Sequence, residues 1–178
     1  APLKGVSDAP ATPTNVVAAG EEITPLPFHR LAEDFEALRL RSDAMLAAAG
    51  NRPQIFVAGL GRVADFTARA TFAKSFFEAG GIEALASSGF AEIDVLKAAF
   101  TESGAAFAVI CGTDGQYEDI GLKAAEAIRD AGASRVYLAG RPANADTLTA
   151  AGVDEFIYMG ADVLDTLARA YDVMGDDK

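Results

Sequence analysis

The sequence is short of the residues that build disulfide frameworks and histidine-rich metal sites. Its 178 residues include one cysteine, Cys111, and one histidine, His29. A single cysteine excludes an intramolecular disulfide framework and favours a reducing compartment, so we expect a cytoplasmic protein. A lone histidine in Pro27-Phe28-His29-Arg30 is more often a surface or packing residue than a ligand. We therefore expect neither a metal site nor a histidine-assisted catalytic residue.

Basic residues are also scarce. Lys and Arg number 15 against 26 Asp and Glu, which gives a net charge of -11. This balance argues against nucleic acid and anionic membrane surfaces as partners, because both require Lys and Arg to neutralise phosphates. No apolar run approaches the ~20 residues that span a bilayer. The chain begins Ala1-Pro2-Leu3 with neither a charged n-region nor an apolar h-region, so we expect a truncated sequence rather than a signal peptide.

Composition divides the chain into three parts. Residues 1–27 hold five of the seven prolines and little apolar periodicity, which predicts an extended arm or linker. Residues 28–50 carry apolar residues at helical spacing and predict a leading helix that Gly50 and Pro53 end. Residues 51–178 alternate short apolar runs with helical patterns, and we expect them to form one α/β domain.

The alternation in this domain predicts five strands and five helices. Such a pattern is typical of a doubly wound parallel sheet covered on both faces. At this size the flavodoxin-like, Rossmann-like strand order 2-1-3-4-5 is the most common choice. The expected strands are 55–59, 82–86, 107–111, 136–139 and 155–159, and the expected helices are 63–79, 92–101, 117–131, 145–150 and 161–174.

The loop after the first strand contains Gly59-x-Gly61-x-x-Ala64, which matches the loose dinucleotide-binding pattern G-x-G-x-x-G/A. In that pattern the loop amides approach a pyrophosphate at a helix N-terminus. The pattern also requires an acid at the end of the second strand, and Ala86-Ser87-Ser88-Gly89 supplies none. Glycines that form a tight strand-to-helix turn are the favoured interpretation.

Cys111 ends the third strand, at the edge of the sheet where a nucleophile would lie. A catalytic cysteine needs a histidine or another cation to lower its pKa, so a buried structural cysteine is favoured over an enzyme that uses Cys111. A phospho-acceptor site built from Asp65, Asp114 and Asp119 is rejected, because the first strand ends without an acid. Asp65 is instead expected in the first turn of a helix, where the helix dipole favours it.

The helix at 63–79 is rich in phenylalanine. One stripe is expected to face the sheet, and Phe72 and Phe76 fall away from it, so they either widen the buried face or form a patch for a partner. The stripe consists of Phe66, Ala70, Ala73 and Phe77.

Several segments resemble the small (beta) subunit of methylmalonyl-CoA mutase. They are Ala68–Ala84, which contains the run Ala70-Thr71-Phe72-Ala73-Lys74-Ser75-Phe76-Phe77, together with Ala139-Gly140-Arg141-Pro142 and Gly152–Tyr158. The segment Arg30–Arg39 looks like the linker that precedes the corresponding domain of that subunit. The resemblance covers about residues 28–175.

The resemblance implies a cobalamin-binding scaffold that has lost its ligand. In the catalytic subunit the equivalent domain carries D-x-H-x-x-G, then S-x-L, then G-G. Aligned on Gly61, the aspartate falls on Val63, the cobalt-ligating histidine on Asp65 and the last glycine on Ala68. The S-x-L and G-G elements fall on Cys111-Gly112-Thr113 and on Ala139-Gly140. A carboxylate replaces imidazole poorly on cobalt, so no cofactor-binding, catalytic or metal residue is expected.

The function implied by the resemblance is that of a non-catalytic C-terminal domain. It would support heterodimer assembly with the large catalytic subunit, which isomerises methylmalonyl-CoA and succinyl-CoA with adenosylcobalamin. The alternative is a functional cobalamin- or nucleotide-binding domain that uses the Gly59-x-Gly61 loop without histidine ligation. A pocket filled by side chains above the first and third strands would favour lost binding, and an open pocket of about 300 Å³ or more would favour the alternative.

Overall fold

The computed structural model describes residues 32–176. The predicted arm at 1–27 and His29 lie outside this range. Five parallel strands form one sheet in the order β2-β1-β3-β4-β5, which confirms the predicted flavodoxin-like topology. The strands are β1 (Gln54–Gly59), β2 (Glu83–Leu85), β3 (Phe107–Cys111), β4 (Arg135–Ala139) and β5 (Glu155–Ile157).

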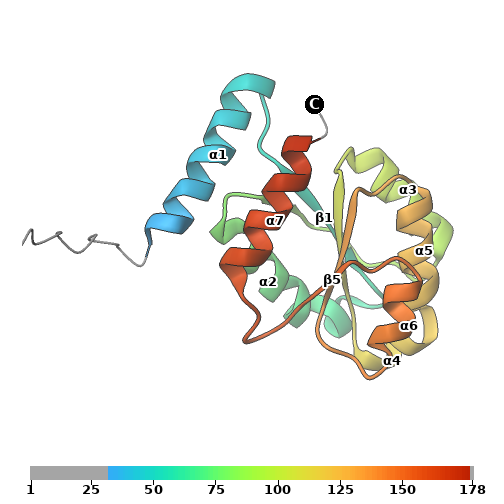
Figure 1. Cartoon of the computed structure of the whole chain (residues 1–178). Coiled ribbons are helices and arrows are strands. Elements are labelled where there is room, and N and C mark those ends of the chain that lie inside the picture. The colour runs from blue at the N-terminus through green and yellow to red at the C-terminus, as the bar shows by residue number, and fades with distance from the viewer. Residues whose placement is uncertain (1–31, 177–178) are drawn as a thin grey trace, which may run out of the picture. The chain divides into compact units, whose positions relative to one another are not determined.

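Helices cover both faces of this sheet (Figure 1). On one side α2 and α7 pack against the strands, and α1 lies beside α7; on the other side lie α3, α5 and α6. None of the helices within residues 32–176 is long and apolar enough to cross a bilayer. Their bounds are α1 (Glu33–Ala49), α2 (Val63–Ala79), α3 (Ile93–Ser103), α4 (Asp114–Gln116), the π-helical turn η1 (Tyr117–Gly121), α5 (Leu122–Asp130), α6 (Ala145–Ala150) and α7 (Val163–Asp176).

Alternate residues of the central strands supply two separate cores. Val109 and Tyr137 face the α2–α7 side, and Ile110 and Leu138 face the α3–α5 side. All five residues of β3 are buried. This double burial explains why Phe107–Cys111 is a continuous apolar run rather than an alternating pattern.

The buried face of α2 is wider than the single stripe of residues predicted to face the sheet. Phe66 and Phe77 face the sheet as predicted, and Phe76 is also buried at 5% exposure, so it widens the buried face. Its ring lies 5.4 Å from that of Phe77, which meets the Tyr137 ring edge-on at 5.0 Å. Phe72 remains half-buried.

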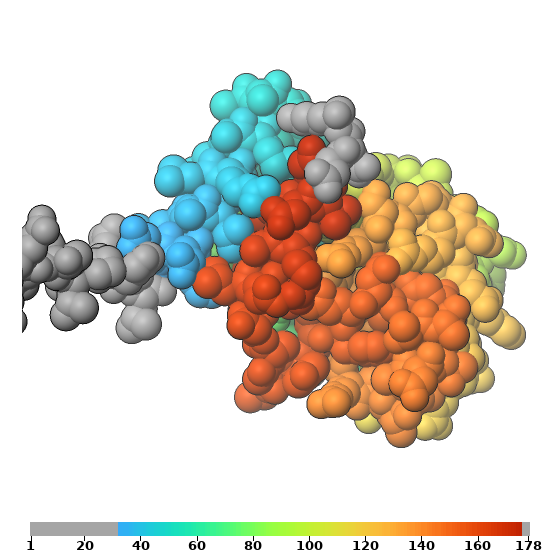
Figure 2. Space-filling view, viewed as in Figure 1, coloured from blue at the N-terminus to red at the C-terminus, as the bar shows by residue number. Residues whose placement is uncertain are grey.

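Within the segment 28–50, where a leading helix is predicted, α1 runs over Glu33–Ala49, and residues 28–31 lie outside the described range. Figure 2 shows α1 lying along α7, where Arg41 and Asp172 form an ion pair at 3.4 Å. The buried Ser42 hydroxyl donates to the Gly81 carbonyl at 2.7 Å and accepts from the Arg52 guanidinium at 2.9 Å. Polar bonds therefore add to the apolar packing that fixes α1.

One predicted element is wrong in detail. The sequence predicts a single helix over 117–131, whereas the structure begins helically at Asp114 and passes through the π-helical turn η1 before α5. The Thr113 hydroxyl caps α4 by accepting from the backbone amide of Gln116. In return, the backbone amide of Thr113 donates to the side-chain carbonyl of Gln116. Apolar periodicity could not locate η1, because a π turn adds a residue without changing the residue types.

Phe77→Ala tests the α2 side of the core. Because Phe77 is fully buried among aromatic rings, the change should lower the free energy of unfolding by about 3–5 kcal/mol in urea denaturation. Met159→Ala, at a side chain that is 89% exposed, is the control and should change it by less than about 0.5 kcal/mol. Equal losses in the two variants would contradict this assignment of the core.

Candidate functional site

The candidate site lies at the carboxyl ends of β1 and β3, where doubly wound domains bind ligands. Gly59 and Cys111 are directly paired at the ends of the two strands. The backbone continues this pairing into the loop, since the Leu60 N–H donates to the Cys111 carbonyl at 2.7 Å. The next amide, of Gly61, donates to the Phe90 carbonyl at 2.8 Å. Two amides of the glycine loop are thus bonded within the protein.

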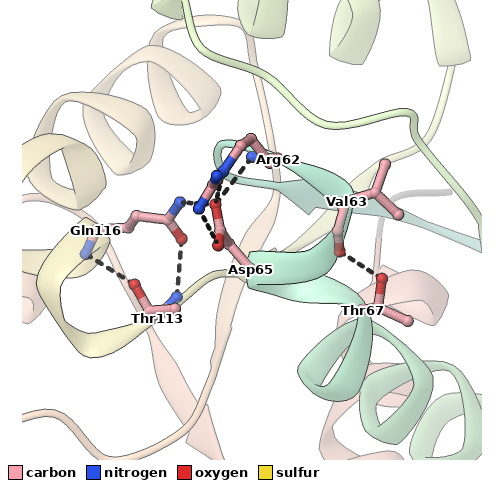
Figure 3. Close-up of polar contacts among 6 residues, drawn as sticks. All are labelled: Arg62, Val63, Asp65, Thr67, Thr113 and Gln116. Atoms are coloured by element: carbon pink, nitrogen blue, oxygen red, sulfur yellow. Dashed lines mark hydrogen bonds and ion pairs between the residues drawn. The ribbon is translucent and has the colours of Figure 1, made fainter.

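Asp65 caps its own helix. Its carboxylate accepts from the backbone amide of Arg62 at 3.3 Å and from the guanidinium of the same residue at 3.1 Å (Figure 3). The hydrogen bond from Arg62 holds the pKa of Asp65 below its ordinary value. The predicted first-turn role of Asp65 is confirmed. At neutral pH its carboxylate is ionised and already accepts hydrogen bonds from Arg62.

Gln116 fills the space between the two strand-end loops. Its side-chain carbonyl accepts from the Thr113 amide at 2.9 Å, and its amide nitrogen lies 3.5 Å from the Asp65 carboxylate (Figure 3). Gly61 has φ +77°, and a Cβ at this position would lie 2.0 Å from the same nitrogen of Gln116. The left-handed backbone at this position favours glycine, and a Cβ here would displace the Gln116 side-chain amide.

Tyr117 closes the neighbouring space above β3 and β4. Its hydroxyl donates to the Ala139 carbonyl at 2.7 Å and accepts from the Gly112 amide at 2.9 Å. The Arg69 guanidinium stacks 5.0 Å from the Tyr117 ring centre. It also donates to the Gly112 carbonyl and to Asp114, both at 2.6 Å. We define Asp65, Arg69, Gln116 and Tyr117 as the strand-end plug.

Cys111 cannot act as a nucleophile in this setting. Its side chain is fully buried, and burial raises the pKa of the thiol to about 12. The nearby Arg69 lowers that pKa only in part. The thiol therefore stays protonated at neutral pH, as a buried structural cysteine does.

The structure places the other predicted positions in three different settings. Gly112 and Thr113 contact the plug directly. Val63 is 59% exposed, and its side chain points away from Asp65 and Gln116 (Figure 3). Ala68, Ala139 and Gly140 line a cavity of 270 Å³ between α2 and the ends of β4 and β5, which Arg69 of the plug also lines.

Sequence reasoning missed three members of the plug, Arg69, Gln116 and Tyr117. A signal existed for Gln116, since Thr113-x-x-Gln116 matches the capping-box pattern. No comparable local signal identifies Arg69 or Tyr117, because their partners are 43 and 22 residues away in the sequence.

Fold and site together define the class: a flavodoxin-like α/β domain whose strand-end loops are bonded to one another by the protein's own side chains. No protein-family model matches the sequence. A solved LuxR-family DNA-binding response regulator from Staphylococcus aureus covers 68% of this chain at 15% identity, with a TM-score of 0.41.

Curated relatives supply the particular family. The methylmalonyl-CoA mutase small subunit of Streptomyces virginiae is 39% identical over 98% of this chain, and that of Propionibacterium freudenreichii subsp. shermanii is 34% identical over 84%. A probable small subunit from Mycobacterium bovis is 37% identical over 97%. The chain spans 28%, 23% and 28% of these three relatives. It is therefore homologous to one segment of the methylmalonyl-CoA mutase small subunit.

Gln116→Ala tests the plug. The change removes the acceptor of the Thr113 amide and opens the space beside Gly61, so the free energy of unfolding should fall by about 0.5–1.5 kcal/mol. Glu118→Ala, at an exposed position on the following turn, is the control. The role of Gln116 would be refuted by a loss no larger than that of the control in urea denaturation.

The buried thiol gives a second measurement. At pH 8 the native chain should react with a thiol reagent at least 100-fold more slowly than the chain in urea, because a pKa of about 12 keeps the thiol protonated and burial blocks access. Raising the pH towards 10 should narrow this gap, because the native thiolate fraction rises about tenfold per pH unit while the thiol of the unfolded chain approaches full ionisation. Fast native labelling at pH 8 would instead restore Cys111 as a reactive residue.

Proposed function

We propose that this chain is the C-terminal cobalamin-binding-like domain of a methylmalonyl-CoA mutase small subunit. In this proposal the domain is non-catalytic, holds no cofactor and supports assembly with a large catalytic subunit. That partner would hold the adenosylcobalamin and isomerise methylmalonyl-CoA and succinyl-CoA. The observation that carries the proposal is the strand-end plug, which occupies the ligand position of the fold with protein side chains.

The residues present do not fit cobalamin ligated by histidine. The position that would supply the imidazole is Asp65, whose carboxylate is bonded to Arg62. The only histidine in the sequence, His29, precedes the domain by more than twenty residues. Within residues 32–176, no three His, Cys, Asp or Glu side chains are grouped to hold a metal ion.

The backbone bonds also disfavour the alternative of a nucleotide or base-on cobalamin held by Gly59-x-Gly61. A phosphate at a helix N-terminus needs amides that are free to donate. The Leu60 and Gly61 amides already donate to Cys111 and Phe90. The Gln116 side chain fills the adjacent space.

Support for an assembly role comes from the relatives. Each is named a small subunit, and the homologous segment is about a quarter of its length. In this proposal the domain keeps a folded core, but protein side chains occupy the position where a cofactor would bind. Its outer surface is then the part that remains available for binding. Binding of a partner is the function this leaves.

A spectral titration tests the cofactor part of the proposal. Adding adenosylcobalamin or hydroxocobalamin to the 178-residue chain should leave the cobalamin spectrum and the melting temperature unchanged, since nothing in the domain ligates cobalt or admits the corrin. The large catalytic subunit from the same organism serves as the positive control. A shift to histidine-ligated, base-off cobalamin, or stabilisation by cobalamin, NAD or FMN, would overturn the proposal.

Sedimentation tests the assembly part. The chain mixed with the purified large subunit should sediment as a complex, and neither adenosylcobalamin nor substrate should be required. An interaction with a Kd of about 1 μM would be nearly saturated at about 100 μM. If the two proteins do not associate at concentrations up to about 100 μM, the assembly role is removed.

A further inference from the structure

Arg69 reaches from α2 to the loop that follows β3. One nitrogen of its guanidinium donates to the Gly112 carbonyl, and another donates to the Asp114 carboxylate, both at 2.6 Å. The ring of Tyr117 lies against the same guanidinium, with 5.0 Å between the guanidinium carbon and the ring centre. A carbonyl, a carboxylate and an aromatic face are groups that bind a planar cation.

A glycine at the end of β4 leaves room for this cation. Gly140 has φ +127°, and a Cβ at this position would lie 3.1 Å from the guanidinium carbon of Arg69, closer than an ordinary contact. The loop after β4 therefore packs against the guanidinium with backbone alone. We call these groups together the guanidinium site: the Gly112 carbonyl, the Asp114 carboxylate, the Tyr117 ring and Gly140.

The backbone amides beside the guanidinium site are not available to an anion. The Gly112 amide donates to the Tyr117 hydroxyl at 2.9 Å, and the Thr113 amide donates to the Gln116 side chain at 2.9 Å. A phosphate needs such amides free to donate. The groups that remain directed at this position accept hydrogen bonds or attract positive charge, so its chemistry favours a cation.

A cavity on the other side of Arg69 gives access to the guanidinium site. This cavity, which we call the hollow, has a volume of 270 Å³ and lies between α2 and the ends of β4 and β5. Arg69 forms part of its wall, and the apolar side chains of Ala68 and Phe72 line it further. If the Arg69 side chain is shortened, the space that it occupied adjoins the hollow. A small alkylguanidinium ion can then enter and place its alkyl group against these apolar walls.

We infer that the strand-end ligand position of this domain is a binding site for a guanidinium cation, which Arg69 fills from within the same chain. Doubly wound domains bind ligands at this position, and here the chemistry selects a planar cation. Arg69 keeps the site closed in the unaltered chain, and a free alkylguanidinium ion takes its place when the side chain is removed. The inference goes beyond the proposed function, because it assigns the chemistry of the closed position and requires no partner subunit.

Chemical rescue of Arg69→Ala tests this assignment in the full 178-residue chain. The change removes two hydrogen bonds and the stacking contact, so the variant should melt at a lower temperature than the unaltered chain. Ethylguanidinium chloride at about 50 mM should raise the melting temperature of the variant by at least about 2 °C, because the ion binds the folded state. In the unaltered chain the site is filled, and the weak denaturing action of the ion should lower the melting temperature by less than about 1 °C.

Matched controls separate occupation of the site from general effects of charge and instability. Lys74→Ala removes a cation from an exposed position on the same helix, and Gln116→Ala weakens the plug while Arg69 still fills the site. Ethylguanidinium should stabilise neither variant. Ethylammonium chloride at the same concentration should not rescue Arg69→Ala, since an ammonium lacks the planar fork that bonds a carbonyl and a carboxylate together.

Asp114→Asn tests the carboxylate of the site. In the Arg69→Ala background this change removes the negative charge that faces the bound ion. The concentration of ethylguanidinium that gives half of the full stabilisation should then rise at least about threefold. An unchanged concentration would show that the ion binds elsewhere and would overturn the inference.

Each of the other outcomes also decides the question. Stabilisation of Arg69→Ala alone among the single variants supports the guanidinium site. The inference is overturned if ethylguanidinium does not stabilise Arg69→Ala relative to the unaltered chain, if ethylammonium rescues it equally, or if pyrophosphate stabilises it instead. Should Arg69→Ala be unfolded on its own, recovery of its far-UV circular dichroism in ethylguanidinium supports the site, and no recovery contradicts it. The cobalamin titration and the sedimentation of the unaltered chain keep their meaning in every case.

Discussion

The hydrogen bonds that the Tyr117 hydroxyl makes at the ends of two strands, β3 and β4, hold the candidate site in its present form. One hydroxyl joins the Gly112 amide after β3 to the Ala139 carbonyl at the end of β4. Burial raises the pKa of this phenol above its ordinary value, so the hydroxyl remains a donor at any physiological pH. Arg69 stacks on its ring and Gln116 bonds to the Thr113 amide, so protein side chains lie at the position where this fold binds ligands.

The plug and the hollow divide the carboxyl edge into two surfaces with different chemistry. Arg69 lies between them, since it stacks on Tyr117 and also lines the hollow. On the plug side, polar groups are satisfied internally and offer little to a partner. On the hollow side, Met159 is 89% exposed and Arg141 stacks on Tyr158 without an ion pair to any residue from 32 to 176. The plug can therefore be bonded within the protein while the hollow remains open to a binding partner.

The resemblance and the structure explain different parts of the site. Alignment on Gly61 identified Asp65 as the position where an imidazole would be required, and this depends only on residue types. It could not tell that the carboxylate caps α2 or that Gln116 reaches across to it. The contact of Gln116 with Asp65 joins residues 51 positions apart, and no local pattern encodes it.

The sequence by itself determined the order of strands and helices, the buried character of Phe107–Cys111 and the first-turn role of Asp65. Each follows from apolar periodicity, turn residues or helix electrostatics, which act over a few residues. Tertiary structure alone decided the π-helical turn at Tyr117–Gly121, the burial of Phe76 and the closure of the strand ends by Tyr117. These depend on packing between distant segments, where the free energy of a contact is set by neighbours that only the folded chain brings together.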